Sequence, residues 1–413
     1  MVVSRNNFNN TEKDRSGIIS NEQEIIYQTH YLKLLNKNPR SNIKEMWMFY
    51  LLSLICWCEP QKVNTKKAKL CEEVATFIPS FCNHSEALHN CKKYCESKVY
   101  RLNCGIVSKV KRFRRITGGS PSEEGQWPWH VSLQYQRKHY CGASILSKRF
   151  VITAAHCVDE RYLTGPGAVE NFQVLVNSNT HIPDAESKLV SINRIAVHHD
   201  YRVTEHTWNK SEYFVVVKAD IAILELAEDL DLLQDSISSI CLPDVLNPFD
   251  EVTDCYIVGW GHITFGDKIT DQLRHAKIPT VPYNTCNANN SFDNNVVSFH
   301  SICAGFANGT ISPCNYDSGG ALACKKNGLW YERGITSSGY KCGGLNAYSL
   351  YTNIVSFEDW IIKTIVNENY KVSVQNPTSY EIERSSRANT FNNKLIELCI
   401  LNILLYIYIY ISC

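Results

Sequence analysis

Short runs of alternating or continuous apolar residues recur from residue 116 to residue 365, and Gly, Asn, Asp or Pro separates each run from the next. Examples are 130–135 (HVSLQY), 171–177 (NFQVLVN) and 328–338 (GLWYERGITSS). Runs of this length between turn residues predict short β-strands, and no long helical period interrupts them. We therefore expect an all-β barrel or sandwich domain over 116–366.

Two other segments have the spacing of helices. Ser356–Val366 (SFEDWIIKTIV) is amphipathic and predicts a helix at the end of the β domain. Residues 85–102 predict a second helix, capped at Ser85, with Cys91 and Cys95 on one face.

Both ends of the chain carry apolar runs. Residues 46–58 are an apolar stretch of 13 residues after basic ones, which suits a signal peptide and is short for a membrane span. Because this run does not begin near the start, we interpret residues 1–45 as a non-structural extension. A signal anchor with a cytoplasmic tail is the alternative.

The C-terminal part, 367–413, begins as a polar tail and ends in an apolar run. That run is consistent with a lipid-anchor signal or a tail span, which would attach the protein to a membrane. It is equally consistent with translation of a simple alternating nucleotide tract, so membrane attachment stays open.

Composition narrows the class of protein. The net charge of +1 gives no electrostatic reason to expect a nucleic-acid partner. The 18 cysteines are too many for an ordinary cytosolic protein and lack metal-type C-x-x-C spacing. They predict disulfides, an oxidising compartment and secretion, with no metal or cofactor. The sequons at Asn83, Asn209, Asn289 and Asn308 are candidate glycan acceptors.

Residues 59–115 are a candidate propeptide. They contain a basic linker and a cysteine-rich mini-domain at 71–104, whose four cysteines Cys71, Cys82, Cys91 and Cys95 allow three connectivities. The segment closes with a basic cluster, Arg112–Arg115, directly before Ile116. This cluster is either a solvated loop or a cut site. In a secreted chain we predict cleavage by another protease between Arg115 and Ile116.

Three short motifs bring candidate catalytic residues. TAAHC contains His156, DIAIL begins with Asp220, and DSGG contains Ser318. A serine hydroxyl needs a base to accept its proton and a carboxylate to orient that base. Taken singly, each motif is also compatible with a structural histidine, a strand start or a turn.

Together with ITGG, VGWG, ICAGF and the final helix, these motifs resemble the trypsin/chymotrypsin family of serine endopeptidases over residues 116–365. The resemblance implies two six-stranded antiparallel β-barrels with the active site between them, acting on peptide or protein substrates. It implies that His156 is the general base, Asp220 its orienter and Ser318 the nucleophile. Ser337 matches the family serine that bonds the triad aspartate.

The resemblance also implies a disulfide pattern and an activation mechanism. A new amino group at Ile116 would pair with Asp317. Breaking such a buried pair by removing one partner costs roughly 3–5 kcal/mol. The mini-domain cysteines would then form two further pairs. The implied family pairs are Cys141–Cys157, Cys286–Cys303, Cys314–Cys342, Cys255–Cys324 and, tethering the propeptide, Cys104–Cys241.

The chain departs from the family pattern in the oxyanion loop. Tyr316 stands where the family has a glycine that donates one oxyanion N–H, and Ser318 donates the other. The amide survives, but a Cβ restricts the backbone. Losing a donor outright costs about 3–4 kcal/mol, and a misaligned donor should cost less. We expect a restrained but active protease whose phenol ring hinders protein inhibitors; a silent pseudoprotease that binds partners is the alternative.

The specificity pocket departs as well. Ser312 lies at its floor in place of the aspartate that binds basic side chains, and its walls are Gly339 and Ser349. We expect a neutral or apolar residue before the cleaved bond. Ser338 replaces a family tryptophan, which weakens the platform for the substrate backbone.

The segment from Tyr201 to Asp220 is longer than the corresponding family loop. It would overhang the cleft and narrow the substrate range, or be a surface insertion without consequence. A further alternative for the whole chain is that residues 71–104 direct localisation of the protease domain.

Overall fold

The computed structural model describes most of the chain from residue 65 to residue 367. The described ranges are 65–79, 81–97, 102–107, 119–163, 169–209, 212–232, 236–246, 248–264, 266–289, 298–339, 342–346 and 348–367. The predictions for 1–45, for the two apolar ends and for the Arg115–Ile116 bond lie outside these residues.

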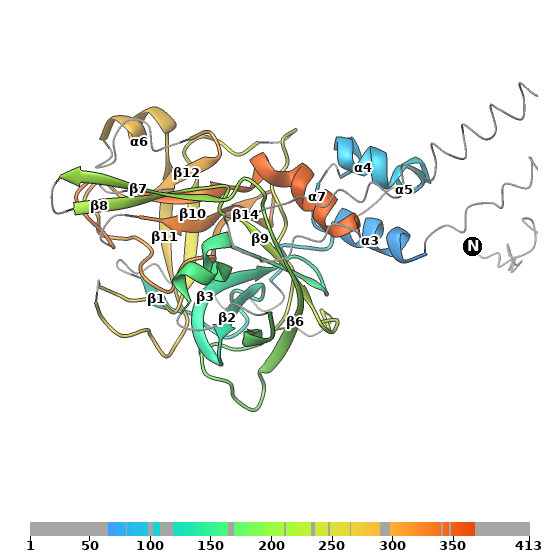
Figure 1. Cartoon of the computed structure of the whole chain (residues 1–413), viewed down its shortest axis with the longest axis horizontal. Helices are drawn as coiled ribbons and strands as arrows, with labels where there is room; N and C mark the ends of the chain where they lie inside the picture. The colour runs from blue at the N-terminus through green and yellow to red at the C-terminus, as the bar shows by residue number, and fades with distance from the viewer. Residues whose placement is uncertain are drawn as a thin grey trace, which may run out of the picture. The chain divides into compact units, whose positions relative to one another are not determined.

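Six antiparallel strands close a first barrel (Figure 1), in the order β2-β3-β4-β9-β6-β5. Apolar side chains fill it: β4 is buried along its whole length, and in β5 only Gln173 is partly buried. The strands are β2 (His130–Tyr135), β3 (Lys138–Ile145), β4 (Phe150–Thr153), β5 (Phe172–Val176), β6 (Lys188–Val197) and β9 (Ala222–Leu226).

A second sheet runs in the order β1-β11-β10-β13-β14-β15-β12 and closes through pairing of β11 with β12. Two antiparallel barrels are thus present, which confirms the predicted fold class. The strands are β1 (Ser120–Pro121), β10 (Asp254–Gly259), β11 (Arg274–Val281), β12 (Ser301–Ala304), β13 (Ala321–Lys326), β14 (Leu329–Ser338) and β15 (Ser349–Asn353), with helix α6 (Tyr283–Asn289) after β11.

The predicted C-terminal helix is present as α7 (Glu358–Val366), preceded by a 3-10 turn over Ile354–Phe357. Nearly all of α7 is buried, including Trp360, Ile361 and Ile365. A helix buried on all sides needs neighbours on all sides.

The mini-domain supplies one of those neighbours. Its helices are α3 (Thr65–Ala75), α4 (Ser85–Asn90) and α5 (Lys92–Ser97), and α3 and α4 both contact α7 (Figure 1). The single helix expected over 85–102 is wrong, because the chain breaks at Cys91, whose φ is −121°. Ser85 is also not the cap: it is the first helical residue, and its hydroxyl donates to Asp359 on α7.

Disulfides and polar contacts tie the mini-domain together and to the barrels. Its four cysteines pair as Cys71–Cys91 and Cys82–Cys95. Ser147 Oγ donates to Glu73, and Leu242 N–H donates to the carbonyl of Phe77 at 2.8 Å. Phe77 belongs to the same buried apolar cluster as residues of the first barrel and α7, so the mini-domain shares their core.

The long segment before Asp220 forms a two-stranded ribbon, β7 (Arg202–Asn209) and β8 (Glu212–Lys218). The ribbon pairs with neither barrel, and β8 lies beside β14. None of the helices within the described residues is long and apolar enough to cross a membrane.

Candidate active site

Strand pairing places His156 and Asp220 together. Thr153 at the end of β4 pairs with Ala222 at the start of β9, so the residues just beyond β4 and just before β9 are neighbours. His156 Nδ1 lies 2.7 Å from Asp220 Oδ2, and the His156 N–H donates to Asp220 Oδ1 at 2.9 Å. These two bonds fix the orientation of the imidazole and leave its Nε2 available to accept a proton.

Asp220 has two further partners from the second barrel. Ser337 Oγ on β14 donates to Asp220 Oδ2 at 2.6 Å, and Thr352 Oγ1 on β15 donates to the Asp220 carbonyl at 2.8 Å. The carboxylate is 1% exposed, so these donors replace water. Site residues from both barrels therefore hold one buried carboxylate.

The electrostatics of this pair favour a charged carboxylate and a basic imidazole. Burial alone would lower the pKa of His156, but the charge of Asp220 and its hydrogen bond raise that pKa above the ordinary value. Burial opposes ionisation of Asp220, yet His156 and the Ser337 hydroxyl lower its pKa. A base with a raised pKa accepts a proton more readily, as general-base catalysis requires.

Close backbone packing brings Ser318 to the same place. The Gly142 N–H donates to the Ser318 carbonyl at 2.8 Å, and the neighbouring Cys141 is bonded to Cys157, which follows His156. Gly319 has φ of +81°, and a Cβ there would lie 2.2 Å from Thr153 Oγ1. Only glycine fits this approach.

The hydroxyl of Ser318 is not hydrogen-bonded to His156 among the described residues, and His156 Nε2 lies 3.8 Å from Cys157 Sγ. In unliganded hydrolases the contact between nucleophile and base is often longer than a hydrogen bond and shortens in the complex.

Two backbone amides of the candidate oxyanion loop lack an acceptor. The carbonyl of Asn315 accepts from the His262 N–H at 3.1 Å, so the N–H of Tyr316, on the opposite side of the same peptide, points away from His262. Within the described residues, the N–H groups of Tyr316 and Ser318 have no acceptor. They are therefore available for a developing oxyanion.

Tyr316 itself adopts φ of +77°, in the left-handed region that glycine favours. The residue is 38% exposed, and the centre of its ring lies 5.2 Å from that of His262. Its carbonyl lies 3.1 Å from His139 Nε2, whose Nδ1 lies 2.8 Å from Ser132 Oγ. Burial lowers the pKa of His139 to about 4, so this histidine is neutral and donates one hydrogen bond to the loop.

These supports are not predictable from the local sequence. His139 and His262 act through backbone atoms of residues far along the chain, and no local motif marks such contacts. The same is true of Thr352, which reaches Asp220 only because β15 pairs with β14.

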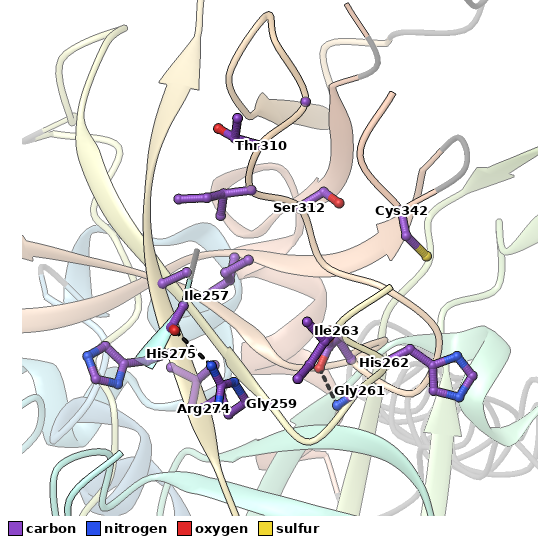
Figure 2. A pocket seen from close by; sticks show the side chains of 16 residues that line it. Ile257, Gly259, Gly261, His262, Ile263, Arg274, His275, Thr310, Ser312 and Cys342 are labelled. Carbon is purple, nitrogen blue, oxygen red and sulfur yellow. Dashed lines mark hydrogen bonds between the residues drawn. The ribbon is translucent and has the colours of Figure 1, made fainter. Parts of the chain in front are cut away.

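Asp317 lines a cavity of about 110 Å³. Figure 2 shows this cavity with Gly259, Gly261 and Ser312 among its lining residues. The Asp317 carboxylate accepts from Gly261 N–H at 2.8 Å and from Cys314 N–H at 2.9 Å. A Cβ at Gly259 or Gly261 would lie within 2.4 Å of this carboxylate, which explains the glycines of the VGWG motif. Burial raises the pKa of Asp317 to about 6, although the hydrogen bonds from the two amides act to lower it.

The candidate specificity pocket is narrow. A Cβ at Gly339 would lie 3.4 Å from Ser349 Oγ, and Ser349 is buried. Ser312 is half-buried and lines the cavity of Asp317, beside Cys342 (Figure 2).

The structure contains disulfides that hold these loops. Cys314–Cys342 joins the oxyanion loop to the pocket rim, and Cys286–Cys303 joins α6 to β12. Cys255–Cys324 links β10 to β13, and Cys104–Cys241 links the mini-domain to the barrels.

Comparison with known proteins agrees with this geometry. A sequence profile of the family described as Trypsin matches residues 116–361. The chain belongs to the trypsin family. Coagulation factor XI of Bos taurus is 31% identical over 269 residues, which cover 64% of this chain and 40% of that protein. This trypsin-family chain thus spans less than half of the length of that relative.

Proposed function

We propose that the chain is the zymogen of a secreted serine endopeptidase, activated by cleavage between Arg115 and Ile116. Ser318 attacks the peptide carbonyl while His156 takes its proton and Asp220 holds the imidazole. His156 then gives that proton to the departing amine as the C–N bond breaks, which leaves the acyl group on Ser318. The amides of Tyr316 and Ser318 stabilise the oxyanion. The acyl-enzyme on Ser318 is then hydrolysed by water that His156 activates.

One observation carries this proposal: Asp220, held by Ser337 at its carboxylate and by Thr352 at its backbone carbonyl, orients His156 beside a loop with two amide donors that lack acceptors among the described residues. Structural histidine–aspartate pairs do not need a neighbouring oxyanion loop. The seven disulfides found among the described residues support an extracellular location.

The cavity of Asp317 supports activation by cleavage. Gly119 lines this cavity together with Asp317, and Arg274 donates to the Gly119 carbonyl at 2.8 Å. A chain running from Ile116 to Gly119 spans at most about 10 Å. A new amino group at Ile116 is therefore within reach of a carboxylate that lacks a cationic partner among the described residues.

The uncut protein should lose stability as the pH rises from about 4 to about 6. Because the pKa of Asp317 is raised to about 6 in the folded state, the folded chain keeps a proton that the unfolded chain releases near pH 4. The free energy of unfolding should fall by about 1–2 kcal/mol. This is less than the full effect of the raised pKa, because the carboxylate faces a cavity.

The measurement is denaturant unfolding of the uncut chain at pH 4 and pH 6, with Asp317→Asn as control. The difference between the two proteins isolates Asp317 from other carboxyl groups. Cutting after Arg115 should abolish the difference, since the amino group would keep Asp317 ionised. An equal pH dependence of both uncut proteins would contradict the assignment.

The pocket supports a neutral or apolar residue before the cleaved bond. Ser312 offers a hydroxyl in place of a carboxylate, and Ser349 narrows the space opposite Gly339. The expected partners are peptide or protein substrates, an activating protease and protein inhibitors.

A pseudoprotease is the second candidate, favoured by the left-handed backbone of Tyr316. Such a protein would bind partners through the same cleft without turnover, if the Tyr316 amide left the oxyanion hole.

Labelling of Ser318 by a small fluorophosphonate tests the proposal. The full chain, cut after Arg115, should be labelled, whereas the uncut chain should react much more slowly and Ser318→Ala not at all. The rate should fall at alkaline pH as the new amino group, with a reference pKa of about 8, loses its proton. No labelling of the cut chain would favour the pseudoprotease.

A further inference from the structure

Two of the predicted glycan acceptors, Asn83 and Asn308, have side chains that the structure describes, and both are exposed. In the first sequon the Ser85 hydroxyl donates to Asp359. In the second, Asn308 Oδ1 accepts from the Thr310 N–H at 3.2 Å and from the Thr310 hydroxyl at 2.9 Å. The second sequon is therefore closed by its own hydroxyl, whereas the first is not.

The turn at Asn308 leaves its amide nitrogen without a partner. The two bonds from Thr310 occupy the side-chain oxygen, and within the described part of the chain the Nδ2 atom of Asn308 has no hydrogen-bond acceptor. Gly309, the next residue, has φ of +67°, which glycine adopts without strain. An exposed, unstrained turn of this kind has room for a bulky sugar on the amide nitrogen.

A second loop lies against the one that carries this sequon. We call residues 305–312 the sequon loop and residues 342–346 the rim loop. The N–H of Asn346 donates to the carbonyl of Ala307 at 2.7 Å. A Cβ at Gly309 would lie 2.5 Å from a backbone oxygen of the rim loop. The two loops are therefore in direct backbone contact on both sides of the acceptor asparagine.

The rim loop offers an exposed apolar side chain at this contact. Leu345 directly precedes the residue that bonds to the sequon loop, and it is 76% exposed. The first sugar of an N-linked glycan, N-acetylglucosamine, has an apolar face of C–H groups. Because removal of apolar surface from water is favourable, this face and Leu345 would stabilise one another in contact.

Both loops are also walls of the Asp317 cavity. Thr310 of the sequon loop and Cys342 of the rim loop line it (Figure 2). A group that holds the two loops together would therefore also hold the cavity in which the new amino group is proposed to bind.

We propose that Asn308 carries an N-linked glycan whose first sugar covers Leu345 and holds the sequon loop against the rim loop. The co-reactant is a lipid-linked oligosaccharide diphosphate. The Asn308 amide nitrogen forms a bond to C1 of the sugar and releases one proton, while the bond from C1 to the diphosphate breaks and the lipid diphosphate leaves. The proposal rests on the proposed function only for secretion, which brings the chain to this donor.

Mass spectrometry of the full chain secreted from eukaryotic cells tests the site. Enzymatic release of N-glycans in heavy-oxygen water converts a glycosylated asparagine to labelled aspartate, so the peptide that contains Asn308 should gain the label. Thr310→Ser keeps the acceptor motif and should keep the label. Thr310→Val has the same shape without the hydroxyl and should lose it.

The failures of the two ideas are distinguishable. A secreted chain with unmodified Asn308 would overturn the glycan and leave the proposed function intact. A chain that is not secreted would contradict both. Fluorophosphonate labelling of the cut wild-type chain reports catalysis separately.

Limited proteolysis by a protease of broad specificity tests the contact between the two loops. Exposed loops are preferred sites of nicking, which follows the population in which the segment opens. Asn308→Gln should therefore be cut within the two loops about fivefold faster than wild type. Asn83→Gln, which removes the other described acceptor, should be cut there at the wild-type rate.

A further variant separates the leucine contact from the bulk of the glycan. Leu345→Ser keeps the glycan and should be cut about threefold faster than wild type, yet it should add nothing in the Asn308→Gln background. Equal cutting of Asn308→Gln and wild type would overturn the holding role. Equal effects of Leu345→Ser in both backgrounds would overturn the contact between sugar and leucine.

Discussion

Replacing Tyr316 with glycine should raise the rate of Ser318 labelling by about ten- to a hundredfold. A non-glycine residue in the left-handed region costs about 1–3 kcal/mol, and at φ of +77° Tyr316 is such a residue. The strain favours competing backbone states in which the Tyr316 amide leaves the oxyanion hole. Glycine removes the strain and populates the productive loop.

Tyr316→Ala is the matched control, because it removes the ring but keeps the Cβ. If backbone strain limits the rate, Tyr316→Ala should label at nearly the wild-type rate while Tyr316→Gly is faster. Equal acceleration in both variants would assign the restraint to the ring. Both variants should bind a bulky protein inhibitor more tightly than wild type, since the exposed ring beside His262 is gone.

Truncating Phe77 to alanine should destabilise the barrels by about 3–5 kcal/mol. Phe77 is fully buried and shares one apolar cluster with Trp360 and Ile361 of α7. Loss of its ring leaves a cavity in a core that the mini-domain and the barrels have in common.

Denaturant unfolding followed by tryptophan fluorescence measures this effect on the barrels themselves, because residues 65–107 contain no tryptophan. Leu88→Ala is the control: Leu88 lies in the same mini-domain but is 51% exposed, and its change should stay within about 0.5 kcal/mol. An unchanged tryptophan transition in Phe77→Ala would show that the mini-domain unfolds independently.

Much of the β domain is readable from the sequence because its strands are short apolar runs between turn residues. The run at 130–135 is β2, and 328–338 contains β14. The C-terminal helix was predicted two residues early, since the backbone first forms a 3-10 turn. In the site, the motifs named His156, Asp220 and Ser318, and the structure brings their loops together.

The mini-domain shows where local patterns fail. Residues 85–102 predicted one continuous helix with Cys91 and Cys95 on one face, yet these two cysteines bond to different partners, Cys71 and Cys82. The helix breaks at Cys91, which is bonded to Cys71, and sequence alone does not reveal this pairing. The strand-forming residues of 202–218 could have predicted the β7–β8 ribbon, because they flank a short polar turn.

The disulfide between Cys104 and Cys241 affects what a cut after Arg115 can change. The cut would divide the polypeptide into two chains that stay joined by this disulfide, so a non-reducing gel would not reveal the cut and a reducing gel would. No fragment would diffuse away. Any surface or partner that retains the mini-domain would also retain the barrels, and a thiol reductant alone would not suffice to separate them while α3 and α4 remain packed on α7.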